Sequence, residues 1–330
     1  RLTDKFMLEG WENRMLQYKW YMQTIKTNAE ANAMLQLFRS QHPTRGATDT
    51  ETDGLNIGIC KPFLFQFGWL HPTLKEGYTF AVDLELQPDL ARQTIKAWLK
   101  LAEELEIHVG HNIKFDMHMW TNAGFSYSKE NLSDTQFYIR YAHNALQTKE
   151  GGPPLKLKEY TTKYITPDAK EFQNKIKKEQ SEIVKALHQK LKKRLVVWKW
   201  ADLQAFFKDP IADWTDLPAF IRAPYLEWLQ NDVPIWLQPS IHGLIEPDQI
   251  LYNKLNRENV TLYAHYDIVY TLEILSSLEP VVAARQNMKG IEFENSLIFP
   301  LFEMERVGFK ADKPYLEQAR LDIKNYIGIQ

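Results

Sequence analysis

Three apolar strand candidates follow one another closely near the N-terminal end, and they constrain the fold more than any other feature. They are "GATDTE" (46–51), "PFLFQFGWL" (62–70) and "YTFAVDL" (78–84). Short strands separated by Asp-Gly, Pro and Gly favour an antiparallel meander. An amphipathic helix at 88–106, a short strand at 107–112 and a helix ending at Gly124 come next. This order predicts an α/β fold, with a sheet covered by helices.

The rest of the chain predicts mainly helices. Apolar residues at helical spacing indicate a helical segment over residues 1–44, broken by "SQHPTRG" at its end. Beyond residue 125 we expect helices again, including a long one from residue 257 to Pro280. Residues 165–250 form an enlarged region, basic in its first half and rich in Trp and Pro in its second.

Composition excludes several classes of protein. The chain has 330 residues and a formal charge of −2, so its overall charge gives no signal for nucleic acid. Cys60 is the only cysteine, which excludes an internal disulfide and a cysteine-based zinc site. No apolar run approaches the ~18 residues of a membrane span, and no apolar signal segment begins the sequence. We therefore expect a cytoplasmic protein that does not enter a membrane.

Four acidic residues lie where apolar residues would be expected. Asp49 and Glu51 share one face of a strand, because strand side chains alternate. Asp116 begins a helix directly after a strand, and Asp267 lies in an apolar helix one turn after Tyr263. Four grouped carboxylates suit two hard divalent cations, which can activate a water and stabilise a leaving oxygen in phosphodiester cleavage.

Each of these signals also has an ordinary interpretation. A D-x-E pair on a strand is commonly a solvated edge, and a Tyr-x-x-x-Asp pair on a helix is commonly a surface hydrogen bond. The combination and its order favour a metal site. The sequence contains no glycine-rich phosphate loop, which argues against nucleotide hydrolysis of the Walker type.

Three segments carry a family resemblance. "DTETDGL" (49–55), "HNIKFDMHMW" (111–120) and "YAHYDIVYTLEI" (263–274) resemble the three motifs of the DEDD 3′–5′ exonucleases, in the order of that superfamily. Tyrosine before the last aspartate is typical of the tyrosine subclass. The resemblance implies a ribonuclease H-like (DnaQ-like) mixed sheet flanked by helices, here with a long, mostly helical insertion.

The same resemblance implies a set of metal ligands and two divalent cations, Mg²⁺ or Mn²⁺. Asp49, Glu51 and Asp267 would hold one ion, and the second would lie between Asp49 and Asp116. Tyr263 would orient the attacking water through its hydroxyl rather than act as a strong base, since an unperturbed tyrosine has a pKa near ~10.

The resemblance also implies substrate-binding residues. Asn112 would place the terminal nucleotide or the loop of the second motif, and Leu55 would pack against the terminal base or sugar. Thr50 is a further candidate for a substrate contact.

The last segment resembles a second family. "FENSLIFPLFEMERVGFKADKPYLEQA" (293–319) is similar to the start of the polymerase region of family A, DNA polymerase I-like enzymes of phage type. "LKLKEYTTKYI" (155–165) is also similar to a helix of their exonuclease domain. This implies an N-terminal segment (1–44), an exonuclease domain (45–288) and the start of a polymerase region (289–330).

That second resemblance implies a proofreading role in DNA replication. The partners would be a single-stranded or frayed DNA 3′ end, a polymerase domain of the same parent protein and replisome accessory proteins, in a bacterial or phage-infected cell. Two alternatives remain open. One is a stand-alone DEDD nuclease related to ribonuclease D, and the other is a non-catalytic copy of the fold that serves as a scaffold.

The enlarged region and the histidines leave further alternatives open. The basic helix at 170–194 is either a solvated face, with its apolar side buried, or a clamp for nucleic-acid phosphates. Its neighbouring Trp residues are more typical of a core than of base stacking. For His108, His111 and His118 the spacing favours structural roles over zinc binding.

Overall fold

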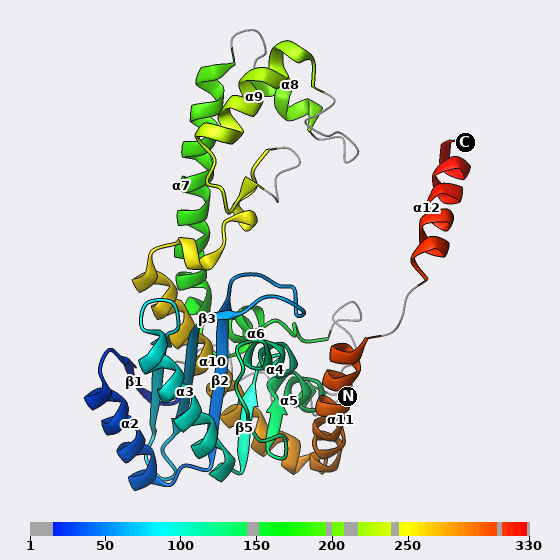
Figure 1. Ribbon diagram of the computed structural model, residues 1–330. Helices are drawn as coiled ribbons and strands as arrows, with labels where there is room; N and C mark the ends of the chain where they lie inside the picture. Colours follow the sequence, from blue (N-terminus) through cyan, green and yellow to red (C-terminus); the bar gives the residue numbers. More distant parts are fainter. Residues whose placement is uncertain are drawn as a thin grey trace.

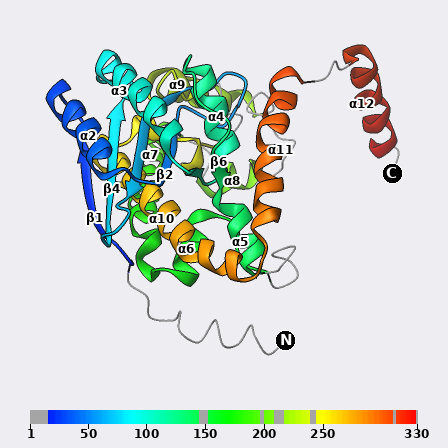
Figure 2. The same ribbon diagram turned by 90° about the horizontal axis from the view of Figure 1, so that it is seen from below.

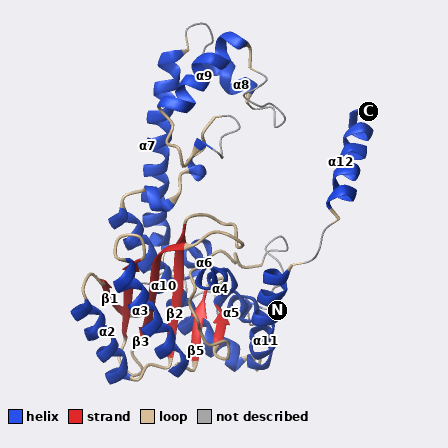
Figure 3. Ribbon diagram, viewed as in Figure 1, coloured by secondary structure: helices blue, strands red, loops and turns tan. Residues whose placement is uncertain are grey.

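The computed structural model describes residues 16–143, 152–195, 200–207, 217–238, 244–308 and 312–328. Its centre is a six-stranded sheet in the order β1-β4-β3-β2-β5-β6 (Figures 1 and 3). The strands are β1 (Lys19–Thr24), β2 (Arg45–Thr52), β3 (Pro62–Leu70), β4 (Glu76–Asp83), β5 (Ile107–Gly110) and β6 (Leu132–Asp134).

The pairing of the strands confirms the predicted fold class. Strand β3 is antiparallel to β2 and β4, which is the expected meander. The pairs β1–β4, β2–β5 and β5–β6 are parallel. A mixed sheet in which β3 alone runs against the other strands is the ribonuclease H-like arrangement that the motifs implied.

Helices cover both faces of the sheet and extend beyond it. They are α2 (Asn28–Gln41), α3 (Pro88–Leu101), α4 (Ile113–Asn122), α5 (Thr135–His143), α6 (Leu157–Tyr164), α7 (Glu171–Arg194), α8 (Trp200–Phe206), α9 (Ala219–Asn231), α10 (Arg257–Ala284), α11 (Met288–Val307) and α12 (Lys313–Gly328). Two short 3₁₀ helices, Pro167–Lys170 and Tyr252–Lys254, lie beside the candidate site.

Strand β3 is buried along its whole length, which explains its unbroken apolar sequence. Phe65, Phe67 and Trp69 pack with side chains of α2, α3 and α4 on one face of the sheet. On the other face, Ala47 of β2 packs with side chains of α5, α6 and α10. Figure 2 shows α2 and α3 on one side of the molecule and α11 on the other.

Gly68 brings α10 close to the sheet. A Cβ atom at this position would lie 2.3 Å from the carbonyl oxygen of Tyr78 and 2.7 Å from Cγ2 of Ile268 on α10. No side chain fits there without displacing the backbone. The glycine therefore fixes the distance between the sheet and the helix that carries Tyr263 and Asp267.

The enlarged region forms an arm of helices α7, α8 and α9 that projects from the sheet (Figure 1). Ile176, Val184, Leu187 and Leu191 form the buried side of α7, as expected for a helix with a solvated basic face. Trp228 of α9 is fully buried against this side, and its indole N–H donates to the carbonyl of Leu187 at 2.9 Å. The prediction of a mostly helical insertion is confirmed for the described residues, whereas Trp198 and Trp214 lie outside them.

The predicted N-terminal helix is wrong over residues 19–24, which form strand β1. Side-chain burial alternates along this stretch, and its backbone pairs with β4 from Lys19 to Thr24. Pairing to an existing sheet edge outweighs the local helical pattern, because strand preference depends on context. Residues 28–41 are helical as expected, and residues 1–15 lie outside the described part.

The long helix that begins at residue 257 does not stop at Pro280 as predicted but continues to Ala284. Leu278 and Val282, on either side of the proline, are both buried in the core beside the sheet. Their burial holds the helix together against the ~3 kcal/mol that an internal proline costs.

Helix α11 packs on the sheet domain, and α12 lies apart from it (Figure 1). Ile298 and Phe302 of α11 belong to the core beneath α2, α3 and α4. The boundary at residue 288 and the assignment of residues 289–330 to a polymerase region remain predictions. Among the described residues, every helix is too short or too polar to span a bilayer.

Candidate active site

Strand β2 and helix α10 bring three of the four predicted carboxylates together. Asp49 and Glu51 lie on the face of β2 that points toward α10, while Thr48 and Thr50 point to the opposite face. One carboxylate oxygen from each of Asp49, Glu51 and Asp267 lies within 4.8 Å of the others. In the described part of the chain this trio is the group whose geometry suits a metal ion.

Asp116 lies beside the trio rather than within it. It is in the first turn of α4, buried, and its Oδ1 accepts a hydrogen bond of 2.6 Å from the hydroxyl of Thr50. Burial raises the pKa of Asp116 well above its usual value, and the charges of Asp49 and Glu51 raise it further. The fourth carboxylate is therefore near enough to share the electrostatics of the trio, but it is held from the other face of β2.

Glu51 and Asp267 are buried and Asp49 is partly buried, and loss of contact with water disfavours the charged forms of Asp49 and Glu51. Desolvation raises the pKa of Asp49 to about 6, although Gln66 of β3 donates a hydrogen bond to its carboxylate. Desolvation raises the pKa of Glu51 to about 8, and the neighbouring charge of Asp49 adds to the shift. Bound cations would reverse this situation, because positive charge stabilises carboxylate anions.

Lys158 places a buried positive charge at this site. It projects from α6 and forms an ion pair with Asp267. Burial lowers the pKa of Lys158 to about 7, and the negative charges of Asp49 and Glu51 oppose this shift. Lys158 lies in the segment 155–165 that resembles the exonuclease helix, but no sequence motif indicated a role for Lys158 or for Gln66. A single polar residue in the apolar run "PFLFQFGWL" was the available signal for Gln66.

Tyr263 lies beside the trio, and its role in orienting water remains a prediction. It lies one turn before Asp267 on α10, and the ammonium of Lys158 lies 4.4 Å from the centre of its ring. Tyr252 is hydrogen-bonded to it, with ring centres 5.7 Å apart. Burial, and then the charge of Glu51, raises the pKa of Tyr263 well above its ordinary value. The phenol therefore keeps its proton at neutral pH and cannot act as a base.

The three predicted substrate-binding residues differ in their surroundings. Asn112 is exposed at the start of α4 with a left-handed backbone (φ 66°), a conformation that asparagine tolerates. Leu55 is 86% exposed in the loop after β2. Thr50 is buried and its hydroxyl is engaged by Asp116, so it supports a carboxylate. Their contact with substrate remains a prediction.

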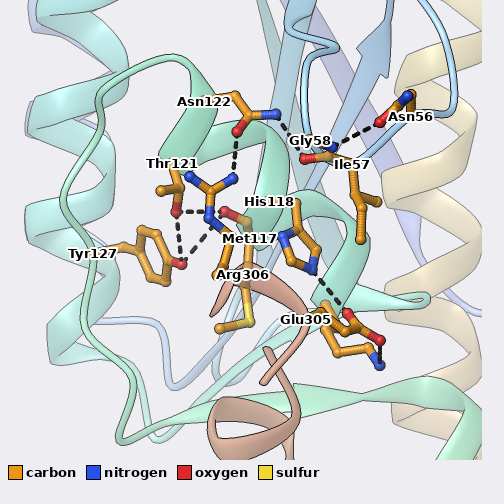
Figure 4. A network of polar contacts seen from close by, with 11 residues as sticks. Asn56, Ile57, Gly58, Met117, His118, Thr121, Asn122, Tyr127, Glu305 and Arg306 are labelled. Atoms are coloured by element: carbon orange, nitrogen blue, oxygen red, sulfur yellow. Dashed lines mark hydrogen bonds and ion pairs between the residues drawn. The ribbon is translucent and has the colours of Figure 1, made fainter. Parts of the chain in front are cut away.

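Helix α11 fixes the helix that carries Asp116 (Figure 4). Glu305 of α11 pairs with Lys114 of α4 at 2.6 Å and contacts Nε2 of His118 at 2.8 Å. His118 is almost completely buried between the two helices. These contacts fix the first two turns of α4 against α11.

Asn122 extends the same network to the loop that contains Leu55 (Figure 4). Its amide donates to the carbonyls of Ile57 and Cys60 at 3.0 and 2.7 Å. Its side-chain oxygen accepts from Arg306 of α11 at 2.6 Å. Asn122, at the C-terminal end of α4, thus connects the loop after β2 to helix α11 through hydrogen bonds.

The histidines near the second motif each have a separate protein partner. Nε2 of His108 lies 2.6 Å from the hydroxyl of Thr48, and Nδ1 of His111 lies 2.7 Å from the hydroxyl of Thr135. His118 contacts Glu305. These contacts fit the structural roles that the sequence favoured.

The trio fits a hard divalent cation. Its donors are carboxylate oxygens, which Mg²⁺ and Mn²⁺ prefer, and they come from two elements held at a fixed separation by Gly68. Desolvation raises the pKa values of Asp49 and Glu51, and the charge of Lys158 only partly opposes this shift.

Comparison with known proteins assigns the chain to a family. The sequence profile of the 3′–5′ exonuclease family matches residues 22–201, which include the trio members of β2 and also Asp116 and Lys158. Because the match covers more than half of the chain, the protein belongs to this family and contains a 3′–5′ exonuclease domain. No curated protein matches the sequence.

Several solved structures align with the chain at low identity. The catalytic core of RRP6 from Trypanosoma brucei is 14% identical, with a TM-score of 0.42, covering 84% of this chain and 52% of that one. NrnC from Brucella melitensis is 12% identical, with a TM-score of 0.41, covering 90% and 98%. RNase D from Escherichia coli is 13% identical, with a TM-score of 0.39, covering 88% and 52%. The chain thus spans about half the length of the RRP6 and RNase D chains.

Proposed function

We propose that the carboxylate site hydrolyses the terminal phosphodiester bond of a nucleic-acid strand from its 3′ end and releases nucleoside 5′-monophosphates. The observation that carries this proposal is the convergence of Asp49, Glu51 and Asp267 within 4.8 Å, with Tyr263 and Asp116 beside them. Family membership supports the direction of cleavage.

Each residue of the site has a separate role in the proposed reaction. Asp49, Glu51 and Asp267 would hold one Mg²⁺ or Mn²⁺ ion, and Asp116 would help to hold a second together with Asp49. When bound, such ions supply a nucleophilic hydroxide and neutralise charge on the leaving oxygen. Tyr263 keeps its proton and orients the attacking water by hydrogen bonding. Gln66 and Thr50 fix the rotamers of Asp49 and Asp116 through the hydrogen bonds described above.

A degradation assay tests the proposal. A 5′-labelled single strand incubated with Mg²⁺ should shorten one nucleotide at a time from its 3′ end, and EDTA should stop the reaction. Asp49→Asn with Glu51→Gln should lower the rate by at least about 10³-fold, since removing groups of this kind costs several kcal/mol of transition-state stabilisation. Unchanged activity in that variant would reject the assignment of the site. A wild-type protein that degrades no strand and binds no Mn²⁺ would instead support the scaffold alternative.

Two cellular contexts are compatible with this chemistry. The first is proofreading within a family A DNA polymerase, which is supported by the sequence of residues 293–319. Its partners would be a frayed DNA end, a polymerase domain of the parent protein and replisome accessory proteins in the cytoplasm. The second is a stand-alone nuclease related to ribonuclease D, the kind of protein named in the titles of the aligned structures.

The substrate separates the two contexts. Proofreading predicts that a DNA strand with a mismatched 3′ end is degraded faster than the matching RNA strand, and faster than a fully paired DNA end. Preference for the RNA strand would support the ribonuclease alternative and contradict the proofreading role, while leaving the proposed chemistry intact.

A further inference from the structure

A cavity opens between α6, the first turns of α7 and α10, directly beside the carboxylate trio. Its volume is about 340 Å³, and Tyr263 and Asp267 form part of its wall. Lys156 and Lys158 line it from the α6 side. Lys170, at the end of the 3₁₀ helix that leads into α7, and Lys177 of α7 line it from the base of the inserted arm. A ligand in this cavity would therefore touch the reaction centre and the arm at the same time.

Two of the four lysines already have acidic partners. Lys158 pairs with Asp267, and Lys156 lies 3.4 Å from Glu159 in the same helix. Lys170 and Lys177 form no ion pair with any residue that the structure describes. Their two positive charges are available for an anionic ligand.

The wall on the side of the arm is formed by residues at helical spacing, all on the same side of the chain. Lys170, Gln173, Asn174 and Lys177 are spaced three, four and seven residues apart, so they project from the same side of the chain. The side chains in this set are cationic or amide groups, which donate hydrogen bonds. Such a surface suits phosphate and sugar oxygens and lacks the aromatic platform that base stacking requires.

The remaining lysines of α7 do not share this placement. Lys185 and Lys193 are exposed on the same helix, form no ion pair with any described residue, and do not line the cavity. Charge on α7 in general can thus be separated experimentally from charge in the cavity.

We propose that this cavity binds the phosphodiester backbone of the substrate strand next to the 3′-terminal linkage, with Lys170 and Lys177 of the inserted arm as the phosphate-contacting residues. The inference rests on the proposed exonuclease function, because it identifies the ligand by its position beside the carboxylate trio. It gives the arm a role in the reaction: the base of α7 completes the wall of the active site.

Binding of a labelled strand tests this inference without requiring hydrolysis. The probe is a 5′-fluorescein 12-nucleotide single strand, prepared both as DNA and as RNA and measured by anisotropy in EDTA at several NaCl concentrations. Lys170→Ala with Lys177→Ala should weaken binding roughly tenfold and reduce the slope of log Kd against log[NaCl] by about 1.4, the value for two lost contacts to a single strand. The matched control, Lys185→Ala with Lys193→Ala, should change Kd less than twofold.

A second probe locates the contact along the strand. Neutral methylphosphonates at the two linkages nearest the 3′ end should weaken binding to the wild-type protein and leave binding to the Lys170/Lys177 variant unchanged. The same groups at the 5′ end should weaken binding to both proteins equally. Equal losses in the two double variants, or equal sensitivity of wild type and variant to the 3′ methylphosphonates, would overturn the inference.

The binding measurements do not depend on hydrolysis of the strand. Circular dichroism and thermal unfolding check that both double variants are folded. A protein that binds the probes as expected but degrades neither DNA nor RNA with Mg²⁺ would contradict the proposed function and leave the phosphate site standing.

Discussion

Asp49 and Glu51 bind protons more tightly in the folded protein than in the unfolded chain when no metal is present. Their pKa values rise from 3.8 and 4.5 to about 6 and about 8 through burial. The stability that protonation provides is fully present at low pH and is lost as the pH rises through these folded-state values. The pKa of Lys158 is instead lower in the folded protein (about 7) than in the unfolded chain (10.5). Its contribution to stability therefore changes with pH between these two values and not below pH 6.5.

This linkage predicts a pH-dependent difference between two metal-free proteins. Relative to Asp49→Asn with Glu51→Gln, the wild type should lose on the order of 4 kcal/mol of unfolding free energy between about pH 4.5 and pH 6.5, about half from each carboxylate. Denaturant unfolding in EDTA measures it. Buried histidines whose pKa values are lowered titrate alike in both proteins and cancel in the difference. A constant difference across this range would show that the two carboxylates are not buried as described.

For single residues, the sequence predicted candidate site residues better than it predicted the residues that surround them. Three spaced motifs predicted Asp49, Glu51, Asp116, Tyr263 and Asp267 as site residues, and the structure brings Asp49, Glu51 and Asp267 together. No role could be assigned to Lys158 or Tyr252 in the same way. Lys158 lies in the segment that resembles the exonuclease helix and Tyr252 lies shortly before the third motif, but only tertiary packing shows that they contact Asp267 and Tyr263. Their roles depend on which elements meet, and the sequence does not encode this locally.

Among the elements, β1 depends on a single buried carboxylate. Glu273 of α10 accepts hydrogen bonds from the backbone N–H groups of Gln17 and Tyr18 at 3.0 and 3.1 Å, and from the indole of Trp20 at 2.9 Å. Glu273→Ala should destabilise the protein by about 2–4 kcal/mol, because it leaves buried donors without an acceptor. Denaturant unfolding gives the value, and hydrogen exchange should show the loss concentrated in β1.

The exposed Glu258 on the same helix is the control for this prediction. Glu258→Ala changes charge only near the helix start and should cost less than ~1 kcal/mol. Equal losses in the two variants would mean that Glu273 does not anchor β1. This long-range anchor is also why the sequence failed to reveal β1: its partner is a carboxylate more than 250 residues away.

The inserted arm depends in turn on Trp228. This side chain is fully buried between α9 and the apolar side of α7. Trp228→Ala should destabilise the protein by about 3–5 kcal/mol, the usual cost of removing a large buried aromatic residue. Phe220→Ala, on the same helix but with a side chain 57% exposed, should cost less than ~1 kcal/mol. Chemical unfolding of the two variants distinguishes a packed arm from a loosely attached one.

For the whole molecule, the order of elements was predictable and the long-range contacts were not. Short runs bounded by turn residues indicated β2, β3 and β4, and the amphipathic pattern indicated α3, because both signals are local. The path of α10 through Pro280 and the docking of α11 on α4 depend on burial against distant segments. The fold class was therefore accessible from local patterns, whereas the shape of the active-site cavity depends on the contacts.

The proposed function depends above all on one property, the binding of divalent cations by Asp49, Glu51 and Asp267. Calorimetric titration of Mn²⁺ into the metal-free protein at pH 8 measures it most directly. We expect saturable binding of two ions with release of protons, since carboxylates must ionise to bind metal, and loss of the tighter site in Asp49→Asn with Glu51→Gln. Absence of saturable binding, or identical titration curves for the wild type and this variant, would contradict the proposed function.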